Sequence, residues 1–401
     1  MAGTHKKYDV LMTYGWCRVG YAVLRSLAKR NVKVLVMDDS SVGMCRLSRL
    51  KAGFRKYPSP YRNPEGYVQT VKDAFETSGA RIIIAPHEES FPLVQNRKIF
   101  PPEALSHYHL WEIISRVNDK NKSAALALSL GIPVPRTVPY ESVDDLENKI
   151  KDSGLNYPLV IKLRRSNSAK GVFYANSFAE IKSIFEKLIS KYDIPKDRFP
   201  IVQEYVQGDG WGVSGVWQNG EPLALVTHKR LREKTFSGGT STLRMTKSNP
   251  LLENYALKIM SHLKWQGTAM IEFKYDESTG QGWFIEINPR LWGSLQLGIH
   301  AGVDIPWTLY NLALGNPVKA PAQKDGVICK WLIGESIVAL KHFAKLDFKK
   351  GINALTPESG MVFDDFFMDD PLVFLGEAGY YFEKFISSGF NANPEEKGMI
   401  G

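Results

Sequence analysis

Three oxygen-bearing side chains share one face of a segment with the pattern of a β-hairpin. Two apolar, β-prone runs flank a turn-rich stretch, Asp276 to Gly282. Chain reversal there sets Glu272 directly opposite Glu286, and strand alternation places Asn288 on the face of Glu286. Carboxylates about 5 Å apart at an effective dielectric of about 20 repel by roughly 3 kcal/mol. A hard divalent cation reverses that cost, so the pattern predicts a Mg2+ site with Arg290 at its edge, rather than a solvated face with aligned charges.

The elements before this hairpin begin with a β-α-β pattern. The expected strands are 8–13, 32–37 and 81–85, and the expected helices are 19–30 and 67–78. Alternating strands and helices predict a parallel sheet with right-handed crossovers. Ligands of such sheets bind beyond the C-terminal strand ends. That edge carries Asp38 and the run His87, Glu88 and Glu89.

The first loop resembles a dinucleotide fingerprint only in part. Gly15 and Gly20 occupy the first and third glycine positions, and Asp38 sits where a ribose-binding acid would be. Cys17 replaces the glycine that lets the backbone approach a pyrophosphate. The pattern therefore favours a Rossmann-like sheet without NAD, whose first helix N-terminus could receive an anion such as a carboxylate.

The second half alternates strands with fewer helices. Expected helices are 119–130, 178–191, 251–263 and 335–346, and expected strands are 157–163, 171–175, 201–205, 212–217, 223–228 and 327–332. Lys162 interrupts an apolar strand, just before a loop of small residues that ends at Gly171. A glycine-rich flexible turn is expected over 236–242.

Composition narrows the class of protein. The chain has 401 residues, enough for several domains, with 44% hydrophobic residues, three separated cysteines and a net charge of +9. The cysteine spacing favours neither a disulfide framework nor a zinc site. The basic residues are scattered, which favours a soluble enzyme handling anions over a nucleic-acid binder. With neither a signal-peptide core nor an apolar run long enough for a bilayer, we expect a cytoplasmic protein without membrane contact.

Motifs in the right order give a family resemblance. They are Asn118-Asp119-Lys120, Lys162 with its loop, Gln203-Glu204-Tyr205-Val206, Glu272, the run from Phe284 to Ser294, and the run from Ala301 to Pro306. Over roughly residues 8–320 the chain resembles the ATP-grasp superfamily, and more narrowly the carboxylate–amine ligases related to carbamoyl-phosphate synthetase and biotin carboxylase. The resemblance implies an α/β (α+β overall) ATP-grasp fold. Its expected parts are an N-terminal Rossmann-like parallel-sheet domain (1–118), a small lid domain (119–202), a catalytic antiparallel-sheet domain (203–321) and a C-terminal α/β extension (322–401).

The resemblance also implies roles for residues. Lys120 and Lys162 match the lysines that hold the ATP phosphates, and Arg164 to Gly171 matches the lid loop, although with fewer glycines than is usual. Gln203, Glu204, Tyr205 and Val206 match the adenine-reading hinge, and Asp209 matches an acid that holds the ribose. Glu272, Glu286 and Asn288 match ligands of Mg2+ (or Mn2+), and Arg290 matches the arginine that faces the transferred phosphoryl group. Candidates for the substrate site are His87, Glu88, Arg230, Ser241 and Arg244, with Glu89 and Arg232 beside them.

The implied activity is an ATP-dependent ligase. It would activate a carboxylate as an acyl phosphate and join it to an amine, releasing ADP and phosphate. The expected partners are small-molecule carboxylates and amines, and a homodimer is one assembly that the sequence allows. The alternatives are a carboxylating enzyme like biotin carboxylase, a non-catalytic ATP-binding protein and an NAD oxidoreductase.

Overall fold

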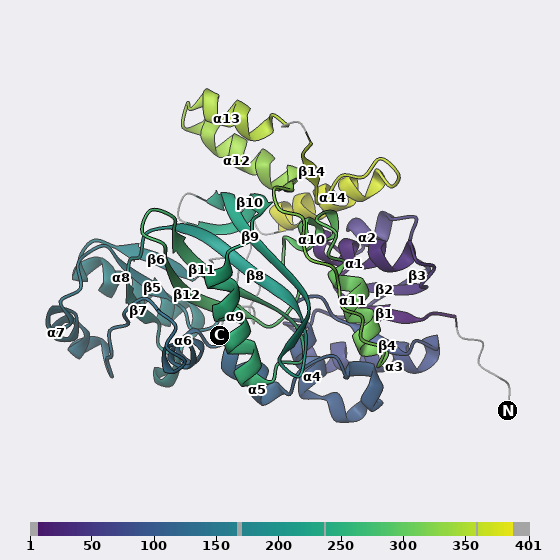
Figure 1. Ribbon diagram of the computed structural model, residues 1–401, viewed down its shortest axis with the longest axis horizontal. Coiled ribbons are helices and arrows are strands. Elements are labelled where there is room, and N and C mark those ends of the chain that lie inside the picture. Colours follow the sequence, from purple (N-terminus) through teal and green to yellow (C-terminus); the bar gives the residue numbers. More distant parts are fainter. Residues whose placement is uncertain (1–6, 167–170, 236–237, 358–359, 388–401) are drawn as a thin grey trace.

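The protein is described by a computed structural model over residues 7–166, 171–235, 238–357 and 360–387. A large, mostly antiparallel sheet stands between a small α/β domain and a parallel-sheet domain, and the C-terminal segment lies along its top edge (Figure 1). This arrangement confirms the expected fold class. Among the described helices, none combines the length and apolar character needed to cross a lipid bilayer.

The N-terminal part is built on a four-stranded parallel sheet in the order β3-β2-β1-β4. Its strands are β1 (Val10–Met12), β2 (Val34–Asp38), β3 (Gly53–Lys56) and β4 (Ile82–Ile84). Its helices are α1 (Arg18–Ala28), α2 (Met44–Leu47), α3 (Pro64–Ser78), α4 (Ser90–Gln95) and α5 (Trp111–Val117), with 3-10 turns η1 (Arg97–Ile99) and η2 (Pro102–Leu105). Strands β1, β2 and β4 are buried throughout, as expected of a parallel sheet covered on both faces.

The small domain is a three-stranded antiparallel sheet in the order β6-β5-β7 with helices packed on it. Its elements are α6 (Lys120–Ser129), α7 (Val143–Ser153), β5 (Leu159–Lys162), β6 (Val172–Ala175), α8 (Phe178–Tyr192), η3 (Lys196–Arg198) and β7 (Ile201–Glu204). Helix α7 was not predicted, although Ser142 and Asp145 form a capping box at its start. Most of the lid loop expected before Gly171, residues 167–170, lies outside the described residues.

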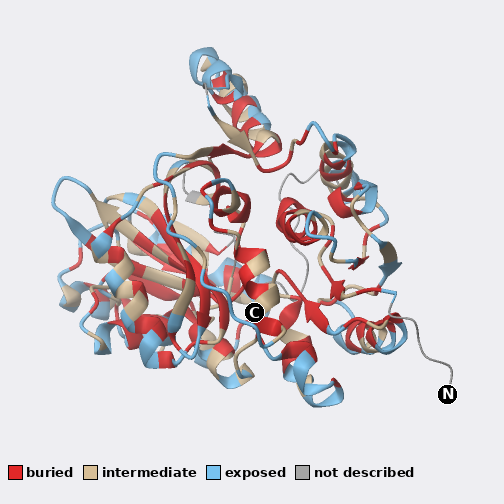
Figure 2. Ribbon diagram, turned by 45° about the vertical axis from the view of Figure 1, so that its right-hand side comes forward, coloured by how far each residue is buried: buried red, intermediate tan, exposed pale blue. Residues whose placement is uncertain are grey.

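The central sheet has seven strands in the order β12-β11-β8-β9-β10-β13-β14. Its elements before the C-terminal segment are β8 (Asp209–Gln218), β9 (Glu221–Thr235), β10 (Gly238–Thr246), α9 (Pro250–Leu263), β11 (Gly267–Asp276), β12 (Gln281–Asn288), α10 (Leu295–His300) and α11 (Ile305–Ala313). Helix α9 packs its apolar side on one face of the sheet, and α10 and α11 share a core with α1 of the parallel-sheet domain. Figure 2 shows the buried interior that results.

The glycine-rich stretch expected as a flexible turn over 236–242 is mostly strand. Residues 236–237 lie outside the described part, whereas β10 begins at Gly238 and pairs with β9 through several irregular steps. Pairing with neighbouring strands satisfies the backbone of this stretch, which overrides its turn-like composition.

The C-terminal segment packs against both the central sheet and the parallel-sheet domain. Its elements are β13 (Ile328–Lys330), α12 (Leu332–Ala344), α13 (Phe348–Leu355), β14 (Val362–Phe363) and α14 (Leu372–Ser387). Strands β13 and β14 extend the central sheet beyond β10, and α14 packs on α2. Helices α12 and α13 form a hairpin that projects from the body (Figure 1).

The first loop is packed closely inside the protein. A Cβ atom on Gly20 would lie 2.2 Å from the Tyr14 carbonyl oxygen, so this glycine serves close packing inside the protein. Cys17, which precedes α1, is buried. At the start of α1, where an external anion was considered, a carboxyl oxygen of Glu377 from α14 lies 3.7 Å from the Arg18 guanidinium.

Candidate active site

The predicted pairing of the two glutamates is confirmed. Glu272 of β11 lies directly opposite Glu286 of β12. The Asn288 side-chain amide donates hydrogen bonds to both, at 3.1 Å to Glu272 Oε1 and 3.0 Å to Glu286 Oε1. The local hairpin therefore collects two carboxylates and an amide at one point.

Basic side chains surround these carboxylates. Lys120 Nζ lies 3.1 Å from Glu286 Oε2, and Arg230 Nη2 lies 2.6 Å from Glu272 Oε2. Arg290 donates from Nη2 to Asn288 Oδ1 at 3.0 Å. Because opposed carboxylates repel, these cations offset the charge that a metal ion would otherwise neutralise.

The two glutamates differ in acidity. Burial raises the pKa of Glu272, and the neighbouring Glu286 raises it further against the opposing effect of Arg230. Burial also acts to raise the pKa of Glu286, but Lys120 and the hydrogen bond from Asn288 together hold it below its usual value. Glu286 is therefore the carboxylate held most firmly in its charged form.

The donor set fits a hard cation. Two carboxylates and one amide are oxygen donors of the kind that Mg2+ takes, and Mg2+ commonly completes its shell with phosphate oxygens and water. Across the described ranges, His, Cys, Asp and Glu side chains do not gather in threes as metal sites. Because the protein supplies few ligands, the site fits an ion that arrives bound to phosphates rather than one held by protein ligands alone.

Two lysines from the small domain face this cluster. Lys120 begins α6, where Asp119 caps the helix, and its Nζ donates to the Ser166 carbonyl at 2.8 Å. Lys162 ends β5 and is buried. Burial lowers the pKa of Lys162 to about 8, and Lys120 and Lys274 lower it while Glu286 raises it. Cations crowded in this way are stabilised by an anion placed among them.

Arg164, the first residue of the expected lid segment, is held against the start of α6. Arg164 makes two hydrogen bonds to Asp119, Nε to Oδ1 at 3.0 Å and Nη2 to Oδ2 at 2.7 Å. The Lys120 N–H donates to the Arg164 carbonyl at 2.9 Å. The lid segment thus begins beside both phosphate-binding candidates.

The expected adenine hinge, Gln203 to Val206, begins in the last two residues of β7 and continues beyond it. The Gln203 amide donates to Thr137 Oγ1 at 2.9 Å, and Glu204 accepts from the Arg136 N–H and Nε, both at 2.8 Å. Tyr205 and Val206 come after the last ladder residue of β7, so their backbone groups lie beyond the sheet. One of the Gln203 and Glu204 side chains was expected to accept from the exocyclic amine of adenine, and both are hydrogen-bonded within the protein. Tyr205 and Val206 remain candidates for main-chain contacts with adenine.

The expected ribose acid lies at the start of β8. Asp209 forms an ion pair with Lys229 at 2.8 Å and is more than half exposed. Lys274 donates to the Gly208 carbonyl at 2.9 Å. This part of the chain forms the rim of the site. The rim carries acidic and basic side chains, and Asp209 is exposed to solvent.

The parallel-sheet domain contributes its C-terminal strand edge. Arg290 Nε lies 3.4 Å from Glu88 Oε1, and the His87 ring stacks on Tyr14 with centroids 4.9 Å apart. Glu89 is instead buried, accepts from the Thr13 hydroxyl at 2.9 Å, and has its pKa raised to about 7 by burial. Glu88 therefore contacts Arg290 and the neighbouring His87 packs on Tyr14, whereas Glu89 faces the interior.

The remaining substrate candidates, Arg230, Ser241 and Arg244, lie in different environments. Arg230 reaches Glu272, but Ser241 donates to the Leu243 and Arg232 carbonyls. Arg244 is fully buried and pairs with Asp364, which follows β14. The structure thus brings Arg230 into the site and gives Arg244 a carboxylate from the C-terminal segment.

Glycines on β8 allow Arg230 to reach across that strand, a feature that sequence reasoning missed. Glu272 pairs with Gly212, and Lys274 pairs with Gly210. A Cβ atom on Gly210 would lie 2.9 Å from the Arg230 side chain. Lys274 was also missed, although strand alternation places it on the face of Glu272.

Comparisons with known proteins agree with this architecture. Residues 117–211 match the RimK-like ATP-grasp domain, and residues 197–334 match the family described as ATP-grasp in the biosynthetic pathway with Ter operon. A carbamoyl-phosphate synthase from Methanobrevibacter smithii is 24% identical over 49% of this chain and 53% of its own length. Cyanophycin synthetase from Synechocystis is 33% identical over 31% of this chain and 14% of its own length. The chain thus spans at most about half the length of these two relatives.

Solved structures share the fold. The biotin carboxylase domain of 2-oxoglutarate carboxylase from Hydrogenobacter thermophilus has a TM-score of 0.64 at 13% identity, over 81% of this chain and 74% of that one. N5-carboxyaminoimidazole synthetase from Staphylococcus aureus has a TM-score of 0.62 at 17% identity, over 84% and 86%. L-amino acid ligase from Bacillus licheniformis has a TM-score of 0.57 at 14% identity, over 77% and 75%. The two family matches, which together cover residues 117–334 of this chain, and the shared fold establish that the chain belongs to the ATP-grasp superfamily.

Proposed function

We propose that the protein is an ATP-dependent ligase that joins a carboxylate to an amine through an acyl phosphate. The observation that carries this proposal is the meeting of Glu272, Glu286 and Asn288 with Lys120 and Arg290. Carboxylates opposed in this way, with cations around them, suit a metal–triphosphate complex. The names of similar proteins, among them carbamoyl-phosphate synthase and L-amino acid ligase, support the same class of reaction.

The first step is phosphoryl transfer. A carboxylate oxygen of the acid attacks the γ-phosphorus of ATP, a P–O bond forms, and the bond to the bridging oxygen breaks to release ADP. Lys120 and Lys162 would hold the phosphates as compact point charges, and Arg290 would face the transferred group. Glu272, Glu286 and Asn288 would hold Mg2+ or Mn2+, which supplies positive charge to the phosphate oxygens.

The second step forms the amide. The amine nitrogen attacks the acyl carbon, phosphate leaves with the electron pair of the broken C–O bond, and the nitrogen loses a proton. Glu88, which contacts Arg290, and the neighbouring His87 would lie where the two substrates meet. Exclusion of water there matters because an acyl phosphate hydrolyses readily.

The domain arrangement suits this order of events. We propose that residues 119–202 close over ATP carried by residues 203–321, while residues 1–118 supply the strand edge. Tyr205 and Val206 would pair with adenine through their backbone groups, Glu204 or Gln203 would accept from its exocyclic amine, and Asp209 would contact the ribose. A cytoplasmic homodimer is part of the proposal, since the Hydrogenobacter biotin carboxylase domain is described as a dimer.

An isotope experiment tests the mechanism. The protein is incubated with ATP, Mg2+ and pools of amino acids and small carboxylic acids, and the acid that yields a product is then supplied with 18O in its carboxylate. An acyl phosphate transfers one 18O to inorganic phosphate and yields ADP. Label in AMP, with pyrophosphate as the other product, would contradict the proposal.

A carboxylating reaction is the second candidate, because the fold neighbours include biotin carboxylase and N5-carboxyaminoimidazole synthetase. Bicarbonate would then be the acid that is phosphorylated. ADP release that depends on bicarbonate, with no carboxylic acid required, would favour this alternative over amide formation.

A further inference from the structure

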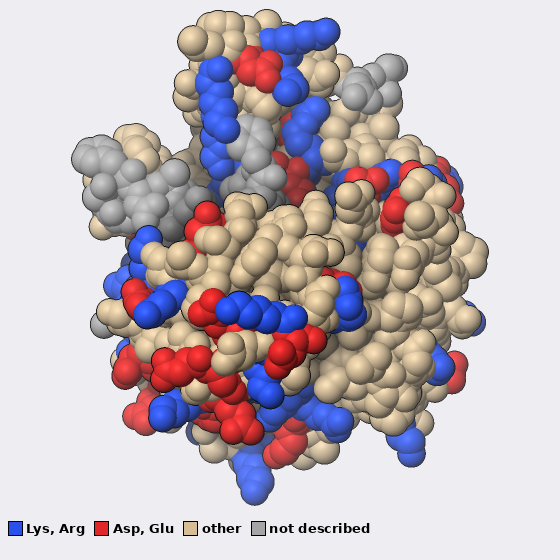
Figure 3. All heavy atoms as spheres, turned by 90° about the vertical axis from the view of Figure 1, so that its left-hand side faces the viewer, with Lys and Arg blue, Asp and Glu red and all other residues tan. Residues whose placement is uncertain are grey.

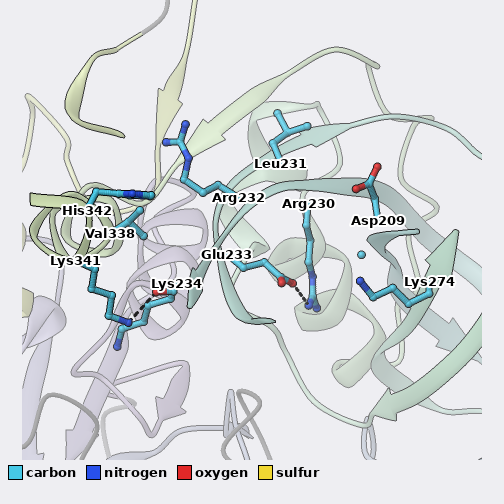
Figure 4. A pocket seen from close by; sticks show the side chains of 11 residues that line it. Asp209, Arg230, Leu231, Arg232, Glu233, Lys234, Lys274, Val338, Lys341 and His342 are labelled. Carbon is cyan, nitrogen blue, oxygen red and sulfur yellow. Dashed lines mark hydrogen bonds and ion pairs between the residues drawn. The ribbon is translucent and has the colours of Figure 1, made fainter. Parts of the chain in front are cut away.

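A basic pocket runs from the rim of the active site to the C-terminal segment. It encloses about 310 Å³ between β8, β9, β11 and α12. Two acidic side chains, Asp209 and Glu233, are outnumbered by five basic ones. The basic ones are Arg230, Arg232, Lys234, Lys274 and Lys341. Figure 4 shows Lys274 and Lys341 at opposite ends, with Arg230 and Glu233 between them.

The two arginines of this pocket already have carboxylate partners. Arg230 contacts Glu272 and Glu233, and Arg232 pairs with Glu335. Their charges are therefore balanced by the protein and contribute little net attraction for a ligand. The remaining positive charge comes from the lysines.

Lys274 and Lys341 donate to neutral groups instead. Lys274 Nζ donates to the Gly208 carbonyl at 2.9 Å, and Lys341 Nζ donates to the Lys234 carbonyl at 3.0 Å. Within the described ranges, neither ammonium lies within ion-pair distance of a carboxylate. A carbonyl balances no charge, and each ammonium has three N–H donors, so both can bind an anion as well.

Partial burial makes such binding more favourable at Lys341. Desolvation lowers the pKa of this lysine, which a bound anion would reverse. The opposite end of the pocket leads to the reaction centre, since Lys274 is two residues from Glu272 on the same strand face. A ligand spanning the pocket therefore has one end beside the metal carboxylates and the other against α12.

We propose that this pocket binds an anionic group, a carboxylate or a phosphate, on one of the two substrates, away from the atoms that react. The inference rests on the proposed ligase function and narrows its substrates to those with an added negative charge. It also gives the C-terminal segment a role, because α12 supplies Lys341 and His342 to one wall. Figure 3 shows basic side chains gathered on the projecting part of the molecule.

Direct binding of anions tests the pocket without turnover. Glutarate and inorganic phosphate are titrated separately into the wild-type protein, Lys341→Gln and Lys345→Gln by calorimetry. Lys345 is a matched control because it is exposed, follows α12 and does not line the pocket. We expect Lys341→Gln to weaken one of the two anions about tenfold or more, since a charge-assisted hydrogen bond is lost, and Lys345→Gln to leave it unchanged. The anion whose affinity falls in Lys341→Gln shows whether the pocket binds a carboxylate or a phosphate.

A second measurement separates this pocket from the nucleotide site. The Kd for ATP should stay the same in Lys341→Gln, while the KM for the charged substrate rises and kcat changes little. Absence of anion binding, binding insensitive to Lys341→Gln, or an equal loss of ATP affinity would each overturn the inference. Failure of the ligase proposal would instead appear as absence of acyl phosphate chemistry, with the calorimetric result intact.

Discussion

Two clusters of opposed charges differ in their access to a ligand. At the hairpin, Glu272 and Glu286 have side chains 16% and 18% exposed, with Lys120 and Arg230 as counterions. At the junction of α1, β14 and α14, the side chains of Arg244, Asp364 and Glu377 are 0% exposed. Under the proposed function, the carboxylates at the first cluster would exchange a lysine or arginine for a metal–phosphate complex. Those at the second are sealed, so their partners are fixed by the fold.

The sealed cluster shows how the C-terminal segment is held. Arg18 lies 3.4 Å from Asp364, and its guanidinium stacks 3.7 Å above the Trp331 ring. Asp365 accepts hydrogen bonds from the first N–H groups of α12, at 3.1 Å from Leu332 and 2.9 Å from Ile333. These contacts fix α12 against the body, and α12 in turn forms one wall of the basic pocket. The comparison therefore separates charges that position the segment from charges available for chemistry.

The largest expected effect is at the open cluster. Glu286→Gln should reduce Mg2+-dependent turnover about a thousandfold or more while leaving the fold intact, because it removes the carboxylate held most firmly in its charged form. Circular dichroism and ADP release measure the two properties. Wild-type turnover in this variant would end the metal assignment, and Glu377→Gln is the matched substitution that should keep activity.

A large stability effect is expected at the sealed cluster. Arg244→Met removes the closest partner of a buried carboxylate and should lower the free energy of unfolding by about 3 kcal/mol, as for other broken buried ion pairs. Urea unfolding followed by circular dichroism measures the loss. Lys29→Met is the control, because its ion pair with Asp369 is about half exposed and should contribute little. Equal midpoints for the two variants would show that Arg244 is not structurally important.

A smaller effect concerns pH. Burial, followed by the nearby Asp365, raises the pKa of Glu377 to about 8 from an ordinary value of 4.5. The folded state therefore binds this proton more tightly, and the resulting stability is complete below pH 4.5 and lost as the pH rises through 8. Between pH 6 and 8 the wild-type protein should lose roughly 2 kcal/mol that Glu377→Gln retains. Parallel pH profiles of unfolding for the two proteins would contradict the assignment.

Several features of the site were predictable because they are local. The pairing of Glu272 with Glu286 follows from strand alternation across a short turn, and the burial of Lys162 follows from the apolar residues around it. The parallel sheet followed from alternating helices and strands. Helix α14 was missed. The first residues of β10 were predicted as part of a turn because glycines favour turns, whereas the strand is held by its pairing with β9 and β13.

The sequence by itself determined the donor set of the hairpin, since residue type and a period of two place its carboxylates together regardless of the remaining fold. Only the tertiary structure decided which arginine reaches them. Arg230 and Arg244 are both basic strand residues, yet Arg230 passes over Gly210 to Glu272, while Arg244 meets Asp364 from a segment 120 positions along the chain. The basic pocket likewise joins Lys274 to Lys341 through packing of α12 on the sheet. Such pairings depend on contacts between elements far apart in sequence, which no local period of side chains encodes.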